Sequence, residues 1–296
     1  MDSHTPNSPH QRFGWKKDKF IPNATYHVLD PAAKIPTIFS LEQYLMPVGD
    51  QGRVNSCTGW GISGGLSSKA KMLGVFKERF SITWIYNGER FMEGDLSEDA
   101  FAFPEDGFKW VCQKGCLLEE YWPYDPNKLD TTPPPSKDDP LAAQWPVDSY
   151  TRVVGGFPAI CSAIAAGNFV PLGNPWFKSW MQPAPDGVLA EVNSHSPLAP
   201  GLGHETFLYG YDQKENVVFG QNSWTTKWGK GGRYVMPASA FDVFNQLIGY
   251  DACYATVKWG PATPTPAFLT PPMIRIEKSE DSGKTWQVLW QGKITK

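Results

Sequence analysis

The sequence predicts an α+β fold, with helices in the first half of the chain and strands in the second. From Trp60 to Leu73 apolar residues recur at three- and four-residue steps, the spacing of one helix face. Two strand-like runs, 203–212 and 217–224, follow one another across a short turn. The 296 residues suit one large two-lobed domain with an appendage.

The first half of the chain is expected to contain an arm, a strap and a helical lobe. Residues 1–13 are polar and are expected to form a flexible arm. Residues 14–48 are interrupted by prolines and read as an extended strap over the body. The helical lobe, at about residues 50–130, is expected to hold three helices: 57 to about 74, one capped by Ser81, and 107–114 ended by Gly115.

The second lobe, at about residues 147–260, is expected to be mostly β and to follow a proline-rich linker at 131–146. One short helix is expected at 158–166, ended by a glycine. The expected strands are 150–154, 169–172, 186–189, 203–212, 217–224, 232–237 and 254–257.

A separate tail follows the second lobe. Residues 261–272 form a proline-rich linker, and residues 273–296 alternate as a β-hairpin around a turn that resembles an Asp-box. An isolated hairpin is marginally stable in water. We therefore expect the hairpin to add to the sheet of the domain or to a protein partner.

Composition excludes several classes of protein. The hydrophobic fraction is 41%, the charged fraction 19% and the net charge −3, which describes a globule without a nucleic-acid-binding surface. No run of 18 apolar residues predicts a membrane span. No apolar segment follows the N-terminus, so we expect no Sec signal peptide.

Cys57 is the strongest candidate for chemistry because it stands where the first helix begins. The free N–H groups and the dipole of a helix N-terminus favour a thiolate over a thiol. A lone buried cysteine is more often a small apolar residue. The nucleophile hypothesis therefore needs a base elsewhere in the chain.

His204 is the histidine that meets this need, because it opens a strand-like run. The next run ends at Asn222, and strands joined by a tight turn are antiparallel, so the two residues are expected to face each other. Asn222 would then hold the imidazole through its side-chain oxygen, and Trp224 would keep water from that bond. A histidine that merely fills the core is the alternative.

In this order, these residues resemble the papain-like cysteine peptidases. Gln51-Gly52 with Ser56-Cys57 matches the family's Q-G-x-C-G-S-C-W block, and Gly203-His204 matches its histidine strand. The N-S-W block corresponds to residues 222–224. His204 lies 147 residues after Cys57, within the ~130–150 spacing of that architecture. The resemblance covers residues 14–260 and implies a two-lobed fold with a helical lobe and a barrel-like β lobe.

The resemblance also implies a mechanism. Cys57 and His204 would form a thiolate–imidazolium pair, and Gln51 with the Cys57 N–H would stabilise the oxyanion. The expected reaction is hydrolysis of protein or peptide substrates by an endopeptidase, without a metal or cofactor. For substrate binding the resemblance suggests Gly107, Gly203 and Trp224. The alternative is that Gly107 and the aspartate before it only cap a helix.

Three departures from the family pattern qualify this picture. The family's disulfide cysteine is replaced by Val54, its glycine by Asn55 and the tryptophan after the nucleophile by Thr58. The Ser-Cys-Thr version resembles a microbial branch that often lacks the long inhibitory propeptide. The missing bridge and the absent Sec signal favour a reducing interior or an assembly such as a virion.

The other cysteines are Cys112, Cys116, Cys161 and Cys253. The Cys112/Cys116 pair has no second ligand pair, so core thiols or a redox-labile pair are expected rather than a metal site.

Two other classes of function fit the same residues. The chain would be a structural or binding component of a larger assembly if the fold served only docking through the strap or the hairpin. It would be an acyl transferase if an amine replaced water at the acyl-enzyme.

Overall fold

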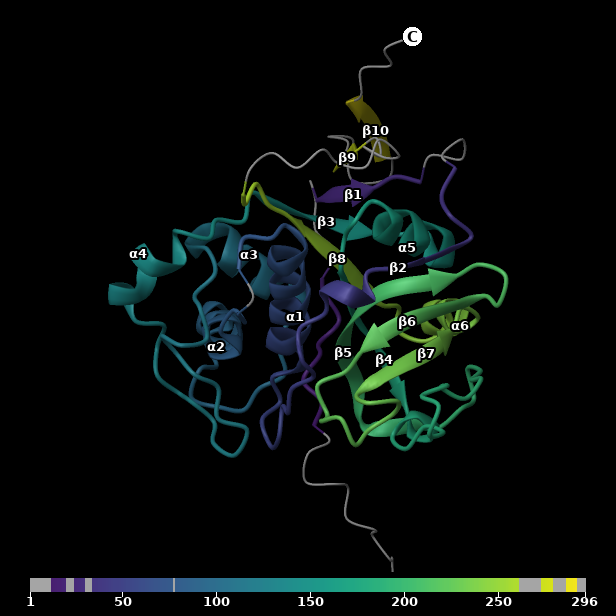
Figure 1. The fold of residues 1–296 in the computed structure, drawn as a ribbon, viewed down its shortest axis with the longest axis horizontal. Helices are drawn as coiled ribbons and strands as arrows, with labels where there is room; N and C mark the ends of the chain where they lie inside the picture. Colours follow the sequence, from purple (N-terminus) through teal and green to yellow (C-terminus); the bar gives the residue numbers. More distant parts are fainter. Residues whose placement is uncertain are drawn as a thin grey trace, which may run out of the picture.

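The computed structural model describes residues 12–19, 24–29, 34–76, 78–260, 273–278 and 286–291. Most helices gather on one side of the molecule and most strands on the other, as Figure 1 shows. The helix α1 (Cys57–Met72) lies between these two parts and packs against both of them.

The helical side is built from α1, α2 (Ile82–Glu93), α3 (Pro104–Lys114) and α4 (Asp139–Ala142). Ser81 caps α2 as predicted, because its side chain accepts a hydrogen bond from the N–H of Trp84. Gly115 ends α3 at a φ of 84°, a conformation that favours glycine. Local capping signals therefore set both of these helix ends.

The helix α1 is buried along most of its length because it carries small residues where other elements approach. A Cβ on Gly64 would meet the ring of Phe207, and one on Gly65 would meet Pro171. These glycines let the strands lie directly against the helix, which brings the first turn of α1 close to the sheet.

The strands form one sheet of ten in the described residues, ordered β10-β9-β1-β3-β8-β4-β5-β6-β7, with β2 paired to β5. All pairs are antiparallel except β1 with β3. The bounds are β1 Thr25–His27, β2 Ile38–Ser40, β3 Ser149–Val153, β4 Val170–Phe177, β5 Leu198–Asp212, β6 Val217–Gln221, β7 Arg233–Pro237, β8 Asp251–Thr256, β9 Met273–Lys278 and β10 Trp286–Gln291.

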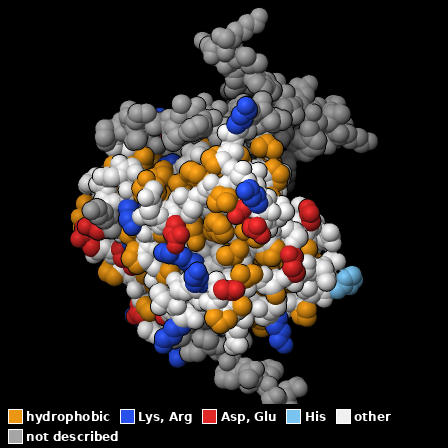
Figure 2. Space-filling view, turned by 45° about the vertical axis from the view of Figure 1, so that its right-hand side comes forward, with side chains coloured by type: hydrophobic (Ala, Val, Ile, Leu, Met, Phe, Trp, Pro, Cys, Tyr) orange, Lys and Arg blue, Asp and Glu red, His pale blue; other side chains and the backbone are white. Residues whose placement is uncertain are grey.

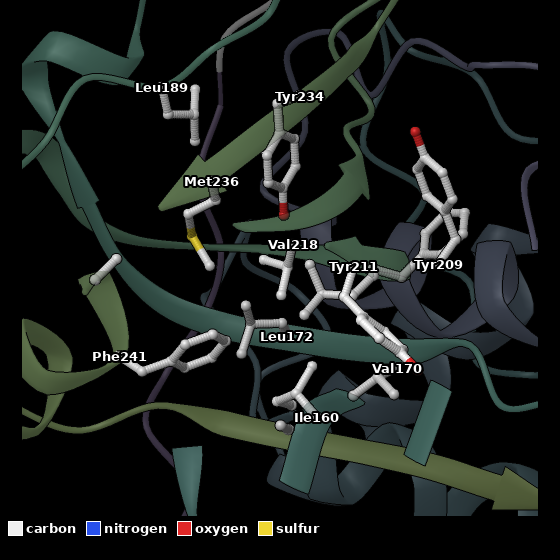
Figure 3. Packing of buried hydrophobic residues seen from close by; sticks show 14 of the residues in the cluster. Ile160, Val170, Leu172, Leu189, Tyr209, Tyr211, Val218, Tyr234, Met236 and Phe241 are labelled. Carbon is white, nitrogen blue, oxygen red and sulfur yellow. The ribbon is translucent and has the colours of Figure 1, made fainter. Parts of the chain in front are cut away.

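Apolar side chains from the strands and from two short helices, α5 (Gly156–Ala165) and α6 (Ala240–Gln246), form the core of the β side. In Figure 3 Leu172, Val218, Met236 and Phe241 converge on a shared interior, and Ile160 of α5 closes it from below. This packed core makes the sheet a rigid support for the residues at the ends of its strands.

The α+β fold class is confirmed, but some element predictions are wrong. His204 lies inside β5 rather than at its start, because the strand extends back along β4 to Leu198. Residues 186–189 make a single bridge, between Val188 and Val235, instead of a strand. The predicted linker at 131–146 contains α4, and α6 was not predicted.

The C-terminal hairpin joins the sheet through its first strand, since β9 pairs with β1 and β10 with β9. The predicted linker at 261–272 and the Asp-box-like turn lie outside the described residues. Residues 1–11 of the predicted arm also lie outside them, whereas Phe13, at its end, is only 6% exposed.

The surface carries no single-sign charge field on the face drawn in Figure 2, where acidic and basic side chains lie among apolar ones. In the described parts of the chain no helix has the length and apolar character to cross a membrane. The same residues contain no cluster of three or more metal-ligating side chains.

Candidate active site

Cys57 is the first residue of α1 and is completely buried. Its sulfur accepts hydrogen bonds from two backbone N–H groups, those of Thr58 and Glu205. The first comes from the helix N-terminus and the second from β5. The residue directly after His204 therefore touches the predicted nucleophile.

His204 and Asn222 meet across the neighbouring strands, as the sequence predicted. The Nε2 atom of His204 lies 2.7 Å from Oδ1 of Asn222. That oxygen also accepts the backbone N–H of Ser223 at 2.7 Å, which fixes the amide orientation. Because an oxygen faces Nε2, the proton belongs on Nε2, and Nδ1 is left as the basic nitrogen.

Aromatic rings enclose His204 on several sides. Trp224 stacks on the imidazole with ring centroids 4.4 Å apart, and Trp176 meets it edge-on at 4.9 Å. Phe13 covers it from a third side, with centroids 6.1 Å apart. The His204–Asn222 hydrogen bond is thereby kept from water, as expected for Trp224.

Gln51 lies in the same site, fully buried. Its Oε1 accepts hydrogen bonds from Ser223 Oγ at 3.0 Å and from Trp224 Nε1 at 3.2 Å. Its Nε2 donates to the carbonyl of Val54 at 3.0 Å and, at a longer 3.4 Å, to that of Phe13. The amide expected to bind a substrate oxygen thus reaches a backbone carbonyl of the chain itself.

A segment from Phe13 to Asp18, which we call the cleft segment, covers this site. Its backbone pairs in parallel with Ala102: the N–H of Lys16 donates to the Ala102 carbonyl at 2.8 Å, and the N–H of Ala102 donates to Gly14 at 2.7 Å. A Cβ on Gly14 would overlap the carbonyl of Asn55, two residues before Cys57. Glycine is therefore required where the segment passes the nucleophile loop.

Trp15 anchors the cleft segment in a slot between the strands and is only 3% exposed. A Cβ on Gly173 or on Gly203 would collide with its indole ring, so both glycines make room for it. The indole N–H donates to Asp251 Oδ2 at 3.0 Å. Gly203, predicted to bind substrate, thus contacts the chain's own tryptophan.

An ion-pair cluster holds the end of the same segment. Asp18 accepts from Arg152 at 2.9 Å and from the N–H of Glu105 at 3.1 Å. Asp251 pairs with Arg152 at 2.8 Å and also with Lys17. The cleft segment is therefore tied to β3, α3 and β8 at once.

The structure does not place Gly107 in the cleft. The helix α3 begins at Pro104, because proline suits the first turn of a helix, and Gly107 lies inside that helix. A Cβ there would meet Glu89 and Ile62 in the core. The backbone that faces the cleft segment is that of Ala102, so the prediction for Gly107 is wrong.

Two buried carboxyl groups, those of Glu89 and Glu205, flank the first turn of α1. Glu89 accepts from the Thr58 hydroxyl at 2.6 Å, and Glu205 lies against Gly61. Burial raises the pKa of both carboxyl groups well above the usual range, and the negative charge of Glu89 raises that of Glu205 further. Burial therefore favours the neutral form of both carboxyl groups in the folded protein.

The covered site also favours the uncharged forms of Cys57 and His204. Burial, followed by the charge of Glu205, raises the pKa of the Cys57 thiol. Burial lowers the pKa of His204 to about 3, against the opposing effect of the Asn222 hydrogen bond. With the cleft segment in place, a neutral thiol and a neutral imidazole are the stable pair.

Replacing Glu89 with glutamine is expected to flatten the pH dependence of stability. A carboxyl group whose folded pKa is raised stabilises the fold below its unfolded pKa of about 4.3, and this contribution is lost as pH rises toward the folded pKa. The loss is at most about 1.4 kcal/mol per pH unit. Urea unfolding should therefore show that the variant gains stability relative to the parent between pH 5 and pH 7. An equal difference at both pH values would contradict a raised pKa of Glu89 in the folded protein.

Known proteins resemble this chain in sequence or in fold. No family model matches the chain. It is 26% identical over 233 residues to an uncharacterised peptidase C1-like protein of Acanthamoeba polyphaga mimivirus, in a match that covers 75% of this chain and 74% of the relative.

Solved structures share the fold. Xylellain, a cysteine protease from Xylella fastidiosa, superposes with a TM-score of 0.73 at 22% identity, over 84% of this chain and 97% of that one. Bromelain of Ananas comosus, solved with an inhibitor, gives 0.56 at 17% identity, over 76% of this chain and all of that one. The papain-like fold and the resemblance to cysteine peptidases are thereby confirmed.

The structure gathers Cys57, His204, Asn222, Gln51 and Trp224 into one site, with Gly203 at its edge. Sequence reasoning missed Ala102, Phe13, Trp15 and Glu205. Residues 14–18 were expected only as part of an extended strap, and their place in the site was not predicted.

Proposed function

We propose that this chain is a cysteine endopeptidase that hydrolyses peptide bonds through a thioester at Cys57. It is a papain-like cysteine peptidase, a hydrolase whose substrates are proteins or peptides. The observation that carries the proposal concerns two residues of one site. Cys57 lies at the N-terminus of α1, and Asn222 holds His204 through Nε2, which leaves Nδ1 free to act as the base.

Each residue has a role that follows from its position. His204 takes the proton of Cys57 at Nδ1, the nitrogen left basic by the bond between Nε2 and Asn222. The thiolate attacks the substrate carbonyl, and the developing oxyanion is bound by Gln51 Nε2 and the Cys57 N–H. His204 then protonates the leaving amine and activates water to release the acid product.

The cleft segment covers the proposed catalytic groups, which is why they are buried in this structure. The Phe13 carbonyl accepts from Gln51 Nε2, where a substrate oxygen would bind, and the Phe13 ring covers His204. Substrate therefore reaches Cys57 only after Phe13 and Trp15 leave the cleft. Strand β10 lies at the open edge of the sheet, where a strand of a protein partner would pair with it.

Trapping the acyl-enzyme tests the proposed reaction and separates it from acyl transfer. A slowly deacylating ester substrate is expected to add its acyl mass to Cys57, and an excess of hydroxylamine should release it. With water alone the product should be the acid. If an added amine is acylated in preference to water at millimolar concentration, the chain is a transferase. If no adduct forms in the parent or in a Phe13→Ala/Trp15→Ala variant with an uncovered site, the proposal fails.

A matched pair of variants locates the adduct. Cys57→Ser replaces the nucleophile with a poorer one and is expected to form no adduct on the same time scale. Cys161→Ser changes a buried thiol on α5, away from the site, and should leave adduct formation unchanged. An adduct that persists in Cys57→Ser would place the chemistry elsewhere.

A further inference from the structure

A small cavity of mixed polar and apolar lining lies beside the proposed catalytic residues, where α1 meets β5 and β6. Its lining includes Trp60 of α1, Glu205 of β5, and Gln221 and Asn222 at the end of β6. The space open to the centre of a water molecule is about 10 Å³, which is roughly what one water needs.

Each of these four residues has at least one polar side-chain atom without a partner in the described part of the protein. Among the described residues, Trp60 Nε1, Gln221 Oε1, Asn222 Nδ2 and both carboxyl oxygens of Glu205 are buried without a hydrogen bond. Two of these groups are N–H donors, and the others are acceptors or a neutral carboxyl. Buried polar groups in native proteins find partners, and one water bonds to as many as four.

We propose that Glu205 is a positioning residue, which holds one internal water against Gln221, Trp60 and Asn222 and thereby fixes the amide that orients His204. The inference rests on the proposed roles of His204 and Asn222.

Glu205 is connected to the His204 imidazole through the side-chain amide of Asn222. Asn222 Oδ1 faces His204 Nε2, so Asn222 Nδ2 points the other way and needs an acceptor. A water held by Glu205 supplies that acceptor. Without it the buried N–H₂ is unpaired and only the Ser223 N–H still holds the amide, so the preference that keeps its oxygen toward His204 is weakened.

The local packing shows that the carboxyl group of Glu205 is accommodated by the fold. A Cβ on Gly61 would lie 2.6 Å from Glu205 Oε1, so the absence of a side chain there makes room for the carboxyl. The backbone N–H of Glu205 also donates to Cys57. One residue therefore touches the nucleophile through its backbone and the cavity through its side chain.

The surroundings of Glu205 favour its protonated form. Burial raises its pKa most, the charges of Glu89, Asp18 and Asp251 raise it further, and Arg79 is among the residues that line the cavity. The thiol of Cys57, at the start of α1, is a further titratable group that interacts with it. A neutral carboxyl can donate its O–H to the water and accept from it, which a carboxylate cannot do.

The test compares two isosteric variants, Glu205→Gln and Glu205→Leu, with Glu89→Gln as the control. Glutamine keeps an acceptor in the cavity and leucine removes it. Glu89→Gln removes a buried acid beside the same helix turn without touching the cavity. The first measurement is the nuclear Overhauser effect between water and the Trp60 indole N–H, assigned with Trp60→Phe in ¹⁵N-labelled protein.

We expect a long-lived water at Trp60 in the parent, in Glu205→Gln and in Glu89→Gln, and none in Glu205→Leu. The imidazole ¹⁵N shifts of His204 should report the Nε2–H tautomer in the first three proteins and a tautomer mixture in Glu205→Leu. The kcat/KM should fall by about 10- to 100-fold in Glu205→Leu and by less than about 3-fold in Glu205→Gln. The pH profile of kcat/KM should shift only in Glu205→Leu.

Two results would overturn the inference: no water signal at Trp60 in the parent, or an unchanged His204 tautomer in Glu205→Leu. The spectroscopic readouts do not depend on catalysis. If they hold while the parent neither cleaves peptides nor forms an adduct, the positioning role of Glu205 stands and the proposed function fails.

Discussion

Replacing Cys57 with alanine is expected to lower kcat/KM for peptide hydrolysis by about 10⁵-fold, to the background rate. The thiolate is the group that forms the covalent intermediate, so its loss removes the first chemical step. Hydrolysis of a fluorogenic peptide measures the loss. His204→Ala should cause a loss of the same order, because the two residues act as a unit.

Cys253→Ala is the matched control for this prediction. Cys253 is as buried as Cys57 but lies on β8, outside the site. Its loss should leave kcat/KM within about 3-fold of the parent if the variant folds, since a Cys-to-Ala change in a core removes little volume. Comparable losses in both variants would point to damage to the fold and would contradict a specific role for Cys57.

The double substitution Phe13→Ala/Trp15→Ala is expected to increase the rate at which Cys57 is alkylated by about 10- to 100-fold. Each change removes a buried aromatic ring that holds the cleft segment, and such changes weaken packing by several kcal/mol. The open state is then populated more often, and the thiol and the imidazole regain water contact and can form the ion pair.

Alkylation by iodoacetamide, followed over time by mass spectrometry, measures this effect. Leu29→Ala provides the control, because Leu29 belongs to the same N-terminal part of the chain but is 38% exposed. Equal alkylation rates in the double variant and the parent would mean that the cleft segment does not limit access to Cys57.

The sequence was sufficient to predict the residues whose chemistry is carried by side chains. Cys57, His204 and Asn222 have distinctive neighbours in an order that matches one known architecture, and antiparallel pairing of two adjacent strands brings the last two together. Ser81 and Gly115 were predictable for a local reason, because a cap depends on only a few consecutive residues.

The parts that were not predicted depend on contacts between distant segments or on the backbone alone. Phe13 meets His204 across most of the chain, and no periodicity in the sequence reports that contact. Ala102 faces the cleft through its N–H and carbonyl groups, so its side chain gives no signal. Glu205 would be read as a solvent-exposed residue, since charged side chains are rarely buried without a partner.

Labelling of the folded protein with an epoxysuccinyl inhibitor, followed by peptide mapping, tests the central claim most directly. The proposed site predicts one adduct, on Cys57, which forms faster in Phe13→Ala/Trp15→Ala and disappears when His204→Ala is added to that variant. Modification of Cys57 no faster than that of the other four cysteines, in the parent and in the open variant alike, would contradict an assembled Cys57–His204 pair.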